Sequence, residues 1–359
     1  MNAAYRLLCC LALTMVAGAC QSPAQRAPAA STAAVTIMTF NVENLFDNTD
    51  DPGKDDATYL PLAAKQNDAH RQGCATIEVD RWREQCLYWD WSDELVERKL
   101  AVVAAAILQV NNGRGPDILA LQEIENVRIL ERLRTEYLTD AGYLPAILIE
   151  GTDLRGIDVA FLSRLPLNSE PQLHPITFDA EFASRVADTR GILQADFELP
   201  DGSVLTGFAV HFPAPFHPTD MRISAYKTLN ALRAGLPGSR PAFAAGDFNT
   251  TSTEDAREKL LDRYARPYWQ VAHDLGCGDD CRGSAYYARD DTWSFLDMLL
   301  WSPANRGANA TWDIRANSVR LANQTSGQRQ NNGTPARFDP AGGPGVSDHW
   351  PLQVTIESR

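Results

Sequence analysis

The sequence predicts an α/β fold in which two β-sheets pack face to face and helices cover both outer faces, giving a four-layer α/β sandwich. The first observation is that segments with one apolar helical face alternate with short apolar strands throughout residues 35–359. The second is that some of these strands are joined by tight turns, which is typical of hairpins. No repeat and no clean linker interrupts the alternation after residue 34, so residues 35–359 are predicted to form one domain.

The first half of this domain has strands and helices in alternation. Residues 35–40 alternate and run apolar, which predicts a buried strand. Ser92 is placed to cap a helix of about residues 93–110, with Leu95, Leu100 and Val103 along one broad face. A short buried strand, a helix and two further strands are predicted at residues 118–121, 127–139, 146–150 and 158–162.

The second half begins with a predicted hairpin, residues 192–199 and 204–211, around the turn Pro200-Asp201-Gly202. Residues 305–345 are rich in asparagine, glycine and arginine and are predicted to be mostly loop, with strand pieces near Trp312 and Val319. The other predicted elements are a helix, an apolar strand, a helix opened by a capping box, and two core strands, at residues 219–236, 241–245, 251 onward, 294–301 and 350–356.

An acidic insertion, residues 47–91, separates the first strand from the first long helix. Its aspartate-rich start, residues 47–56, is predicted to be a solvated loop rather than a calcium loop, because EF-hand spacing is missing. Its tryptophans, Trp82, Trp89 and Trp91, are predicted to form a small satellite core. The alternative is an exposed aromatic loop that inserts into a membrane.

The N-terminus has the layout of a bacterial export signal, predicted for residues 1–19. Arg6 precedes an apolar stretch at residues 7–16, and small residues lead up to Cys20. The stretch is too short to span a bilayer as an ordinary helix. Cys20 is predicted to carry a lipid anchor, with simple cleavage before it as the alternative, and residues 20–34 are predicted to be a flexible tether. The protein is therefore expected to be an outer-membrane lipoprotein, or else periplasmic or secreted.

Four cysteines remain after Cys20, and they are predicted to form the disulfides Cys74–Cys86 and Cys277–Cys281, which are the pairs closest in sequence. A zinc site is the rival interpretation. It is disfavoured because neither pair has the C-x-x-C spacing and because an exported protein folds in an oxidising compartment.

Composition limits the function. With 44% hydrophobic and 22% charged residues, the 359-residue chain is globular and has ample material for a core. The formal net charge of −13 argues against a protein that coats nucleic acid by bulk electrostatics. A nuclease remains compatible with that charge, because bound cations would neutralise its site locally.

The stretch Gly246-Asp247-Phe248-Asn249 follows a buried strand and offers a carboxylate and a carboxamide. At the strand period of two, Asp247 and Asn249 project to the same side, one as a proton acceptor and the other as a hydrogen-bond donor. Taken alone this is a turn sequence. Other predicted strands also end in acids, amides or imidazoles, which is how α/β folds build active sites: Asn41, Glu123, Asp158, His211, Asp297, Asp348 and His349.

These segments occur in the order of the endonuclease/exonuclease/phosphatase superfamily, which the sequence resembles over about residues 35–357. Each motif is weak alone, but seven in family order are a strong signal. They are F-N-V-E-N at 40–44, L-Q-E at 121–123, R-G-I-D-V-A-F-L at 155–162, V-H-F at 210–212, G-D-F-N at 246–249, F-L-D-M-L-L at 295–300 and S-D-H-W-P-L at 347–352.

The resemblance implies a metal site and hence a metal-dependent hydrolase. Glu123 is expected to be the principal ligand of Mg²⁺ or Mn²⁺, with Ca²⁺ as a further candidate. Asn41, Glu43 and Asp348 are expected to ligate the ion or hold its waters. Carboxylate oxygens suit such hard cations, and Mg²⁺ characteristically keeps several waters.

The resemblance also assigns roles around the phosphate. Asp247 is expected to orient or deprotonate the attacking water, while Asn249 and His211 hydrogen-bond the phosphate and Arg155 clamps a second oxygen. Asp158 is either a structural acid that pairs with Arg155 or a catalytic one.

A further expected pair is His349 held by Asp297, whose carboxylate should raise the pKa of the imidazole. Whether Asp247 or His349 is the base stays open from the sequence.

Three functions compete. The first is metal-dependent hydrolysis of phosphodiesters by an extracytoplasmic nuclease that acts on DNA or RNA without base specificity. The second is a phosphoesterase of the sphingomyelinase or inositol-phosphate type. The third is a catalytically silent binding protein, which should lack Glu123, Asp247 or His349, and all three are present. No protein partner is implied.

Overall fold

The computed structural model describes residues 33–278, 281–303 and 311–359. The predicted export signal, Cys20 and nearly all of the predicted tether lie outside these residues. Ala33–Arg359 form one compact unit. Among the described residues, none of the helices combines the length and the hydropathy of a membrane-spanning segment.

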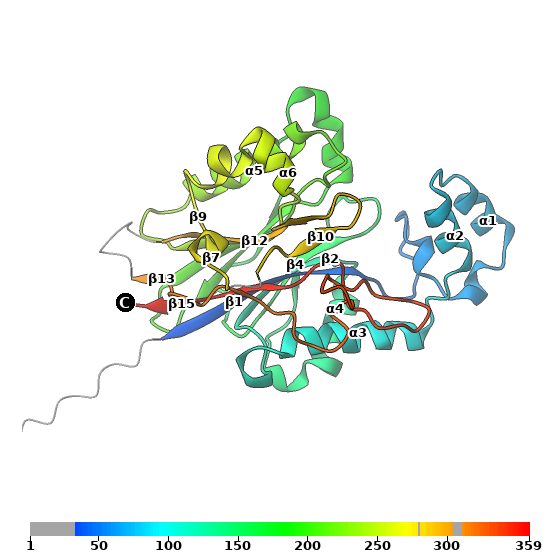
Figure 1. Ribbon diagram of the computed structural model, residues 1–359, viewed down its shortest axis with the longest axis horizontal. Coiled ribbons are helices and arrows are strands. Elements are labelled where there is room, and N and C mark those ends of the chain that lie inside the picture. The colour runs from blue at the N-terminus through cyan, green and yellow to red at the C-terminus, as the bar shows by residue number, and fades with distance from the viewer. Residues whose placement is uncertain (1–32, 279–280, 304–310) are drawn as a thin grey trace, which may run out of the picture. The chain divides into compact units, whose positions relative to one another are not determined.

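The first sheet has seven strands in the order β13-β15-β1-β2-β4-β3, with β14 also paired to β15 (Figure 1). Strand β1 is parallel to β2 and antiparallel to β15. The strands are β1 (Ala34–Leu45), β2 (Ile118–Ile124), β3 (Ile147–Leu148), β4 (Asp158–Ser163), β13 (Trp312–Ile314), β14 (Arg320–Leu321) and β15 (Leu352–Ser358).

The second sheet has six strands in the order β5-β6-β7-β8-β12-β9, and only β7 and β8 run parallel. Its strands are β5 (Gln172–His174), β6 (Ile192–Glu198), β7 (Val204–His211), β8 (Ala242–Asp247), β9 (Gln270–Val271) and β12 (Asp297–Ser302). A separate hairpin pairs β10 (Ala285–Tyr287) with β11 (Thr292–Ser294).

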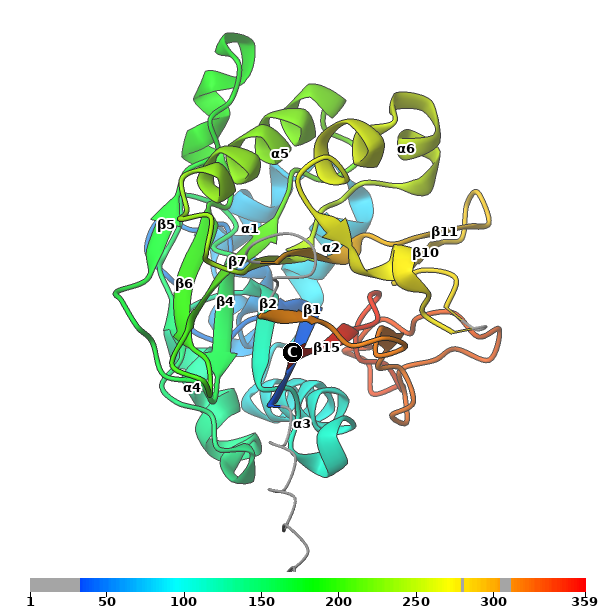
Figure 2. The same cartoon turned by 90° about the vertical axis from the view of Figure 1, so that its left-hand side faces the viewer.

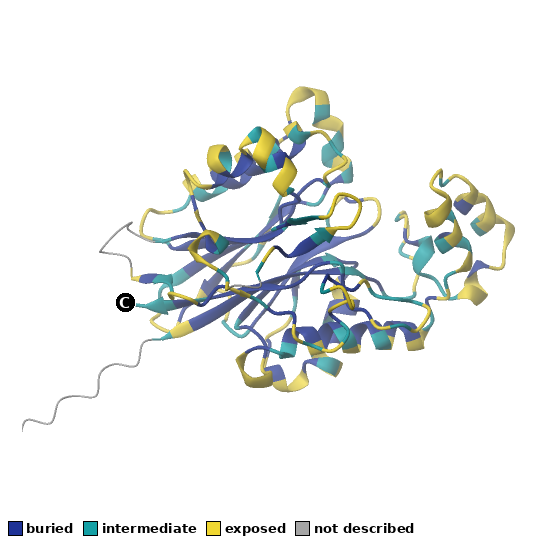
Figure 3. Cartoon of the chain, in the orientation of Figure 1, coloured by how far each residue is buried: buried dark blue, intermediate teal, exposed yellow. Residues whose placement is uncertain are grey.

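Helices cover the outer faces of both sheets, which confirms the predicted four-layer sandwich. Helix α3 packs on the first sheet and α5 on the second, on opposite sides of the paired sheets (Figures 1 and 2). Figure 3 shows the buried residues concentrated in the strands and in the inward faces of these helices. The α-helices are α1 (Asp68–Ala75), α2 (Asp80–Tyr88), α3 (Asp93–Leu108), α4 (Val127–Arg132), α5 (Thr219–Ala234) and α6 (Ser252–Glu258).

Strand alternation separates the layers. In β8, Phe243 and Ala245 face the other sheet, whereas Ala242 and Ala244 face the helical layer of α5. Both faces are buried, so the strand reads as a continuous apolar run rather than an alternating one. In β7 and β12 too, odd-numbered residues project between the sheets and even-numbered ones toward α5. This parity decides where the polar residues at the strand ends point.

Most predicted elements are present within a few residues, with two differences. The helix predicted for 127–139 is α-helical only to Arg132 and continues as a wider π-turn, Leu133–Tyr137. The strand predicted for 294–301 is two strands, because the chain leaves the β10–β11 hairpin after Ser294 and joins the second sheet at Asp297.

The prediction of a separate satellite core is wrong, because Trp91 and Phe46 belong to the main core between the first sheet and its helices. Trp91 is 2% exposed and donates its indole N–H to the carbonyl of Phe46 (3.1 Å). Tyr59 stacks on Phe46 with ring centroids 3.9 Å apart, and Trp89 packs against both Tyr59 and Trp91. Trp82, by contrast, is 56% exposed.

Both predicted disulfides are present. Cys74–Cys86 joins α1 to α2, and Cys277–Cys281 closes a short loop. His70 lies beside the first pair, 3.2 Å from the Cys74 sulfur, and with the two sulfurs it has the composition of a metal site. Because these sulfurs are bonded to each other, they are not thiolate ligands.

The predicted capping box is only half formed. The Thr251 hydroxyl accepts a hydrogen bond from the amide of Glu254 (3.1 Å), but the Glu254 carboxylate turns to α5, where it binds Thr219 and Arg222. Arg222 also donates to three carbonyls of the loop after β7, at Pro213, Ala214 and His217. A buried ion pair therefore ties α5 to α6, and Arg222 also holds the loop after β7 against them.

Replacing Arg222 by alanine is expected to lower the free energy of unfolding by about 3–5 kcal/mol, because it leaves the Glu254 carboxylate buried without its cation. Urea denaturation measures this loss. The control is Arg257→Ala on the exposed side of α6, which should change stability by about 0.5 kcal/mol or less. Equal effects of the two substitutions would refute the structural role of the buried pair.

Candidate active site

Three polar side chains sit side by side at one end of the second sheet. His211 of β7 is in register with Asp247 of β8, and Asp247 is in register with Asp297 of β12. All three are odd-numbered, so they share the face that Phe243 and Leu299 present to the other sheet. The ends of the strands therefore aim a carboxylate pair and an imidazole into the layer between the sheets.

The first sheet supplies Asn41 from β1 and Glu123 from β2. Asn41 has the parity of Val35 and Ile37, which face the second sheet. Glu123 would face the other way in a regular strand, because it alternates in step with Leu119 and Leu121, which pack toward the helices. However, the strand register shifts between Gln122 and Ile124, and Glu123 itself is left-handed (φ 64°). This irregularity turns the carboxylate toward the site, a common use of such bulges.

Backbone strain is concentrated around the site. Glu43, Asn44 and Asn249 also have positive φ angles, at 55°, 61° and 49°. Such conformations are costly for residues with side chains and cluster where function requires them. Gly246 is required for a steric reason, because a Cβ there would lie 1.9 Å from the carbonyl oxygen of Val210. Only glycine allows β7 and β8 to approach this closely beside Asp247.

Asn41 connects the two sheets within the site. Its Nδ2 donates to Glu123 Oε1 (3.3 Å) and to Asp247 Oδ2 (3.1 Å). Asp247 Oδ1 accepts from the amide of Asn249 (2.8 Å). The Asn249 side chain uses one N–H on the carbonyl of Phe212 (3.0 Å), which leaves its second N–H available.

The predicted Asp–His pair is present: His349 Nδ1 lies 2.6 Å from Asp297 Oδ2. Burial alone would lower the pKa of His349, but the carboxylates of Asp297, Asp348 and Asp247 outweigh burial and hold the pKa well above its ordinary value. These carboxylates therefore favour the cationic form of His349. Its Nε2 lies 4.0 Å from Asp247 Oδ2.

The pKa of His211 is shifted in the opposite direction. Burial, together with the charges of Arg190, Arg155 and His349, holds its pKa well below the ordinary value. Its Nε2 lies 3.6 Å from Asp247 Oδ2 and 4.0 Å from Glu123 Oε1. The site thus favours the neutral form of His211 and the cationic form of His349.

Asp247 sits between these imidazoles. Burial raises its pKa to about 7, with Asp297 adding to the shift and His349 opposing it. A carboxylate with a pKa near neutrality is suited to accept a proton and to release it again.

Glu43 and Asp348, two of the four expected metal ligands, are held together by Arg337. The Glu43 oxygens accept from Arg337 (2.8 Å) and from the amides of Phe338 and Asp348 (3.0 and 3.1 Å). Arg337 also pairs with Asp348. Burial and the charge of Asp348 raise the pKa of Glu43 to about 7.

The set of donors fits a hard cation. Glu123, Asn41, Glu43 and Asp348 offer oxygen atoms, which Mg²⁺ and Mn²⁺ prefer. Glu123 differs from Glu43 and Asp348 in that no ion pair joins it to Arg337 among the described residues, although Asp348 is more exposed (29% against 16%). The raised pKa values of Glu43 and Asp247 reflect partly burial and partly crowded negative charge, which a cation would relieve.

Two expected residues lie less centrally. Arg155 is exposed, although its charge acts on both His211 and Tyr59. Asp158 accepts from the amide of Gly151 (2.9 Å), and burial and neighbouring Glu150 raise its pKa to about 8. In the part of the chain that the structure describes, Arg155 is not its hydrogen-bonding partner, so the expected Asp158–Arg155 pair does not form.

Four further residues reach the site without having been predicted. Lys99 of α3 is fully buried, and its Nζ donates to the carbonyls of Val42 and Val346. A lone lysine among the apolar residues of a helix face is a signal that could have identified it. The others come from a short 3-10 turn and from loops, none of which has a recognisable sequence pattern: Tyr59, Arg190 and Arg337.

Two packed sheets with carboxylates, amides and imidazoles gathered at their strand ends form the architecture of a phosphate-ester hydrolase. The chain belongs to the endonuclease/exonuclease/phosphatase family, whose model matches residues 38–349 and whose members are hydrolases that act on phosphate esters. A search of curated protein sequences gives no match.

Solved structures share the fold at low sequence identity. The endonuclease/exonuclease/phosphatase from Bacteroides vulgatus is 16% identical, with a TM-score of 0.53, over 91% of this chain and all of that one. A humanized D. rerio TDP2 is 14% identical, with a TM-score of 0.54, over 90% of this chain and 98% of that one. D. rerio TDP2 in complex with a single-strand DNA product gives the same identity and coverages, with a TM-score of 0.50.

Proposed function

We propose that this protein is an exported, metal-dependent nuclease that cleaves phosphodiester bonds of DNA or RNA without base specificity. One observation carries the proposal. Within a fold of phosphate-ester hydrolases, Asp247 lies between two imidazoles and is hydrogen-bonded to Asn41 beside Glu123. The similarity of the fold to TDP2, which has been crystallised with a DNA product, supports a nucleic-acid substrate.

The metal is proposed to be Mg²⁺ or Mn²⁺, with Ca²⁺ as a further candidate. Glu123 would be its principal ligand, and Asn41, Glu43 and Asp348 would ligate it or hold its waters. The hydrogen bonds and ion pairs of Glu43 and Asp348 to Arg337 favour the water-holding role for these two. When bound, the ion would polarise the phosphoryl group and neutralise its charge.

Side chains of the protein would accept the proton of the attacking water and bind the phosphate oxygens. Asp247, with a pKa of about 7, would accept the proton of the attacking water. Because the surrounding carboxylates hold the pKa of His349 well above its ordinary value, we assign the role of base to Asp247, and a protonated His349 would stabilise the developing negative charge. The free N–H of Asn249 and the neutral His211 would donate to phosphate oxygens, and Arg155 would approach from the exposed rim.

Export is proposed from the predicted signal and from the two disulfides, because disulfides persist in oxidising compartments. Membrane attachment would depend on a lipid at Cys20. The lipid-hydrolase alternative needs an apolar surface that inserts into a membrane. In the insertion, Trp91 is buried and Trp89 packs against it, whereas Trp82 and Tyr88 are 56% and 69% exposed.

Chelation with EDTA is expected to abolish cleavage of single-stranded DNA and of RNA by the purified residue 33–359 domain, and Mg²⁺ or Mn²⁺ should restore it. Gel electrophoresis of the products measures this. The salt dependence should be shallow, because the acidic protein would contact few phosphates. Activity that persists in EDTA would contradict the metal proposal. Intact nucleic acid with every metal, alongside hydrolysis of sphingomyelin vesicles or inositol phosphates, would replace the nuclease by the alternative.

A further inference from the structure

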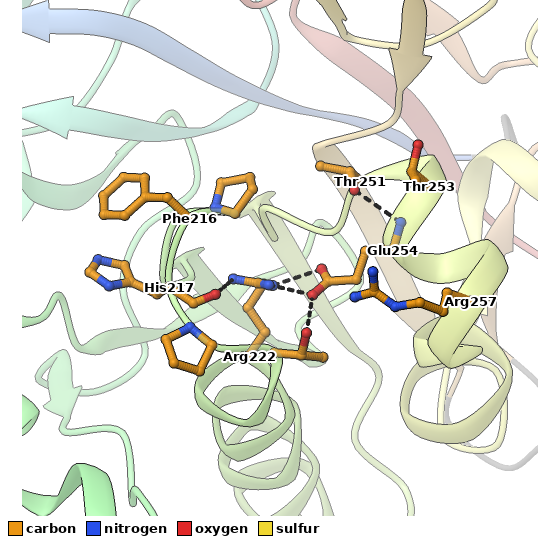
Figure 4. Close-up of a pocket in the computed structure, with 10 residues that line it drawn as sticks. Phe216, His217, Arg222, Thr251, Thr253, Glu254 and Arg257 are labelled. Atoms are coloured by element: carbon orange, nitrogen blue, oxygen red, sulfur yellow. Dashed lines mark hydrogen bonds and ion pairs between the residues drawn. The ribbon is translucent and has the colours of Figure 1, made fainter. Parts of the chain in front are cut away.

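A cavity of about 420 Å³ lies between the loop that follows β7 and the start of α6. Its volume falls within the range of roughly 300–1,000 Å³ that is usual for small-molecule sites. Figure 4 shows Phe216 and His217 on one side, and Thr251, Thr253 and Arg257 on the other. The Arg222–Glu254 ion pair lies between these two sides.

Each of the two segments that line the cavity follows a strand that ends in the candidate active site, β7 or β8. Phe216 is five residues after His211, a span of at most about 18 Å even if fully extended. The hydrogen bonds from Arg222 to the carbonyls of Pro213 and Ala214 fold this segment back (3.2 and 2.7 Å). Thr251 is two residues after Asn249. Both sides of the cavity are therefore only a few residues along the chain from His211 and Asn249.

The chemistry of the cavity matches a nucleobase. Phe216 is 81% exposed and contacts His217, with ring centroids 4.2 Å apart. The two rings are tilted by 45°, so Phe216 alone offers an open aromatic face, and burial with nearby Arg185, Arg190 and Arg222 lowers the pKa of His217 and favours its uncharged form. The hydroxyls of Thr251 and Thr253 lie opposite, where they can exchange hydrogen bonds with the edge of a base.

The charges of the cavity also suit a polyanion. Glu254 is its buried acid, and this carboxylate is neutralised by Arg222 and hydrogen-bonded by Thr219. Arg257 stands at the rim with its side chain 65% exposed, and Glu258 engages only one of its N–H groups (2.7 Å). A flanking phosphate would therefore meet a cation at the rim.

We propose that this cavity holds an unpaired nucleobase next to the scissile phosphate, stacked on Phe216, and that the substrate is consequently single-stranded DNA or RNA. The proposal rests on the proposed nuclease function and narrows its substrate. Stacking on an aromatic ring tolerates any base, because every base has a π-face. The cavity thus reconciles a defined base contact with cleavage that lacks base specificity. A base in a duplex is paired and stacked already, so it does not enter.

The test compares a single-stranded oligonucleotide with a base-free oligomer of the same length, built from abasic tetrahydrofuran units. Phe216→Ala is expected to lower kcat/KM on the oligonucleotide by about tenfold to a hundredfold, mainly through KM, and to leave cleavage of the base-free oligomer nearly unchanged. Phe216→Trp should restore cleavage. Tyr88→Ala is the matched control, since Tyr88 is a 69% exposed aromatic on α2 of the insertion. Thermal melting checks that each variant folds.

Several outcomes would overturn the proposal. Equal losses on both oligomers would mean that Phe216 shapes the loop rather than stacks on a base, and no loss on either would remove its role. Wild-type cleavage of duplex DNA as fast as of the single strand would refute the substrate class while leaving the nuclease function intact. A wild-type protein that cleaves no nucleic acid defeats the proposed function itself. If Phe216→Ala instead weakens only binding to sphingomyelin vesicles, the ring belongs to a membrane contact.

Discussion

Replacing Asp247 by asparagine is expected to lower kcat by about 10³-fold or more on any phosphodiester that the protein cleaves. Asparagine keeps the size of the side chain and an oxygen for the amide of Asn249, but it cannot take a proton from water. Initial rates at saturating substrate and metal measure the effect. A variant within about tenfold of the wild type, equivalent to roughly 1.4 kcal/mol in the barrier, would show that Asp247 is not the base.

The same variant should be as stable as the wild type or more stable at neutral pH. The folded-state pKa of Asp247 is raised from 3.8 to about 7, so its ionisation opposes folding. The stability that the protonated carboxyl contributes is present below about pH 4 and is lost as the pH rises through about 7. Denaturation in EDTA measures this difference. The free energy of unfolding of Asp247→Asn should rise relative to that of the wild type between about pH 4 and pH 7, and this difference should not change below about pH 4.

Asp158→Asn is the matched control for this experiment. Asp158 is also a buried carboxylate at the end of a strand, and its pKa is also raised, to about 8. It bonds the amide of Gly151 rather than any group of the candidate site. Its substitution should keep the activity within about tenfold of the wild type. Equal inactivation by both substitutions would indicate general damage by the loss of a buried carboxylate.

Replacing Glu123 by glutamine is expected to abolish both turnover and binding of Mn²⁺ or Mg²⁺. Glutamine is isosteric, and one oxygen can still accept from the amide of Asn44. The lost negative charge is what a hard cation requires of its principal ligand. Isothermal titration calorimetry of the metal gives a result that does not depend on activity, and kcat should fall by about 10³-fold or more.

Glu125→Gln is the control for Glu123, because the two residues are two positions apart and carry the same group. Glu125 is buried, its Oε2 accepts from the amide of Asp47 (2.6 Å), and burial followed by the nearby aspartates raises its pKa to about 8. Its variant should bind the metal like the wild type. Metal binding that survives Glu123→Gln but is lost in Glu125→Gln would move the proposed ion into the acidic insertion.

Much of the architecture could be predicted from the sequence because the strands are local features. The apolar run before Asp247 identifies β8, and the turn at Pro200-Asp201-Gly202 identifies the β6–β7 hairpin. The pairing His349–Asp297 was expected from the order of motifs, although these residues are 52 positions apart. Short-range patterns therefore sufficed for the elements, and the family resemblance pointed to residues that the fold brings together at the strand ends.

Other parts of the site had no local signal. Glu123 has the strand parity of a residue that faces α3, and only the irregularity in β2 turns it toward Asn41. Arg337 sits in a loop whose composition predicts nothing more than a loop, yet it holds Glu43 and Asp348 together. The capping box predicted a hydrogen bond from the amide of Thr251 to the Glu254 carboxylate, but this carboxylate binds Arg222 instead. In each case a distant partner outweighs the local preference.

The sequence by itself determined which residues end strands and what chemistry they bring, because hydrophobic period and residue type are properties of the chain. The tertiary structure decided which of these residues contact one another and how their pKa values shift. Asn41 and Asp247 are 206 positions apart, and they meet only because the two sheets pack with their polar strand ends together. Burial in that layer lowers the pKa of His211, while the assembled carboxylates raise that of His349. Neither the dielectric environment nor the neighbouring charges exist until the sheets are packed.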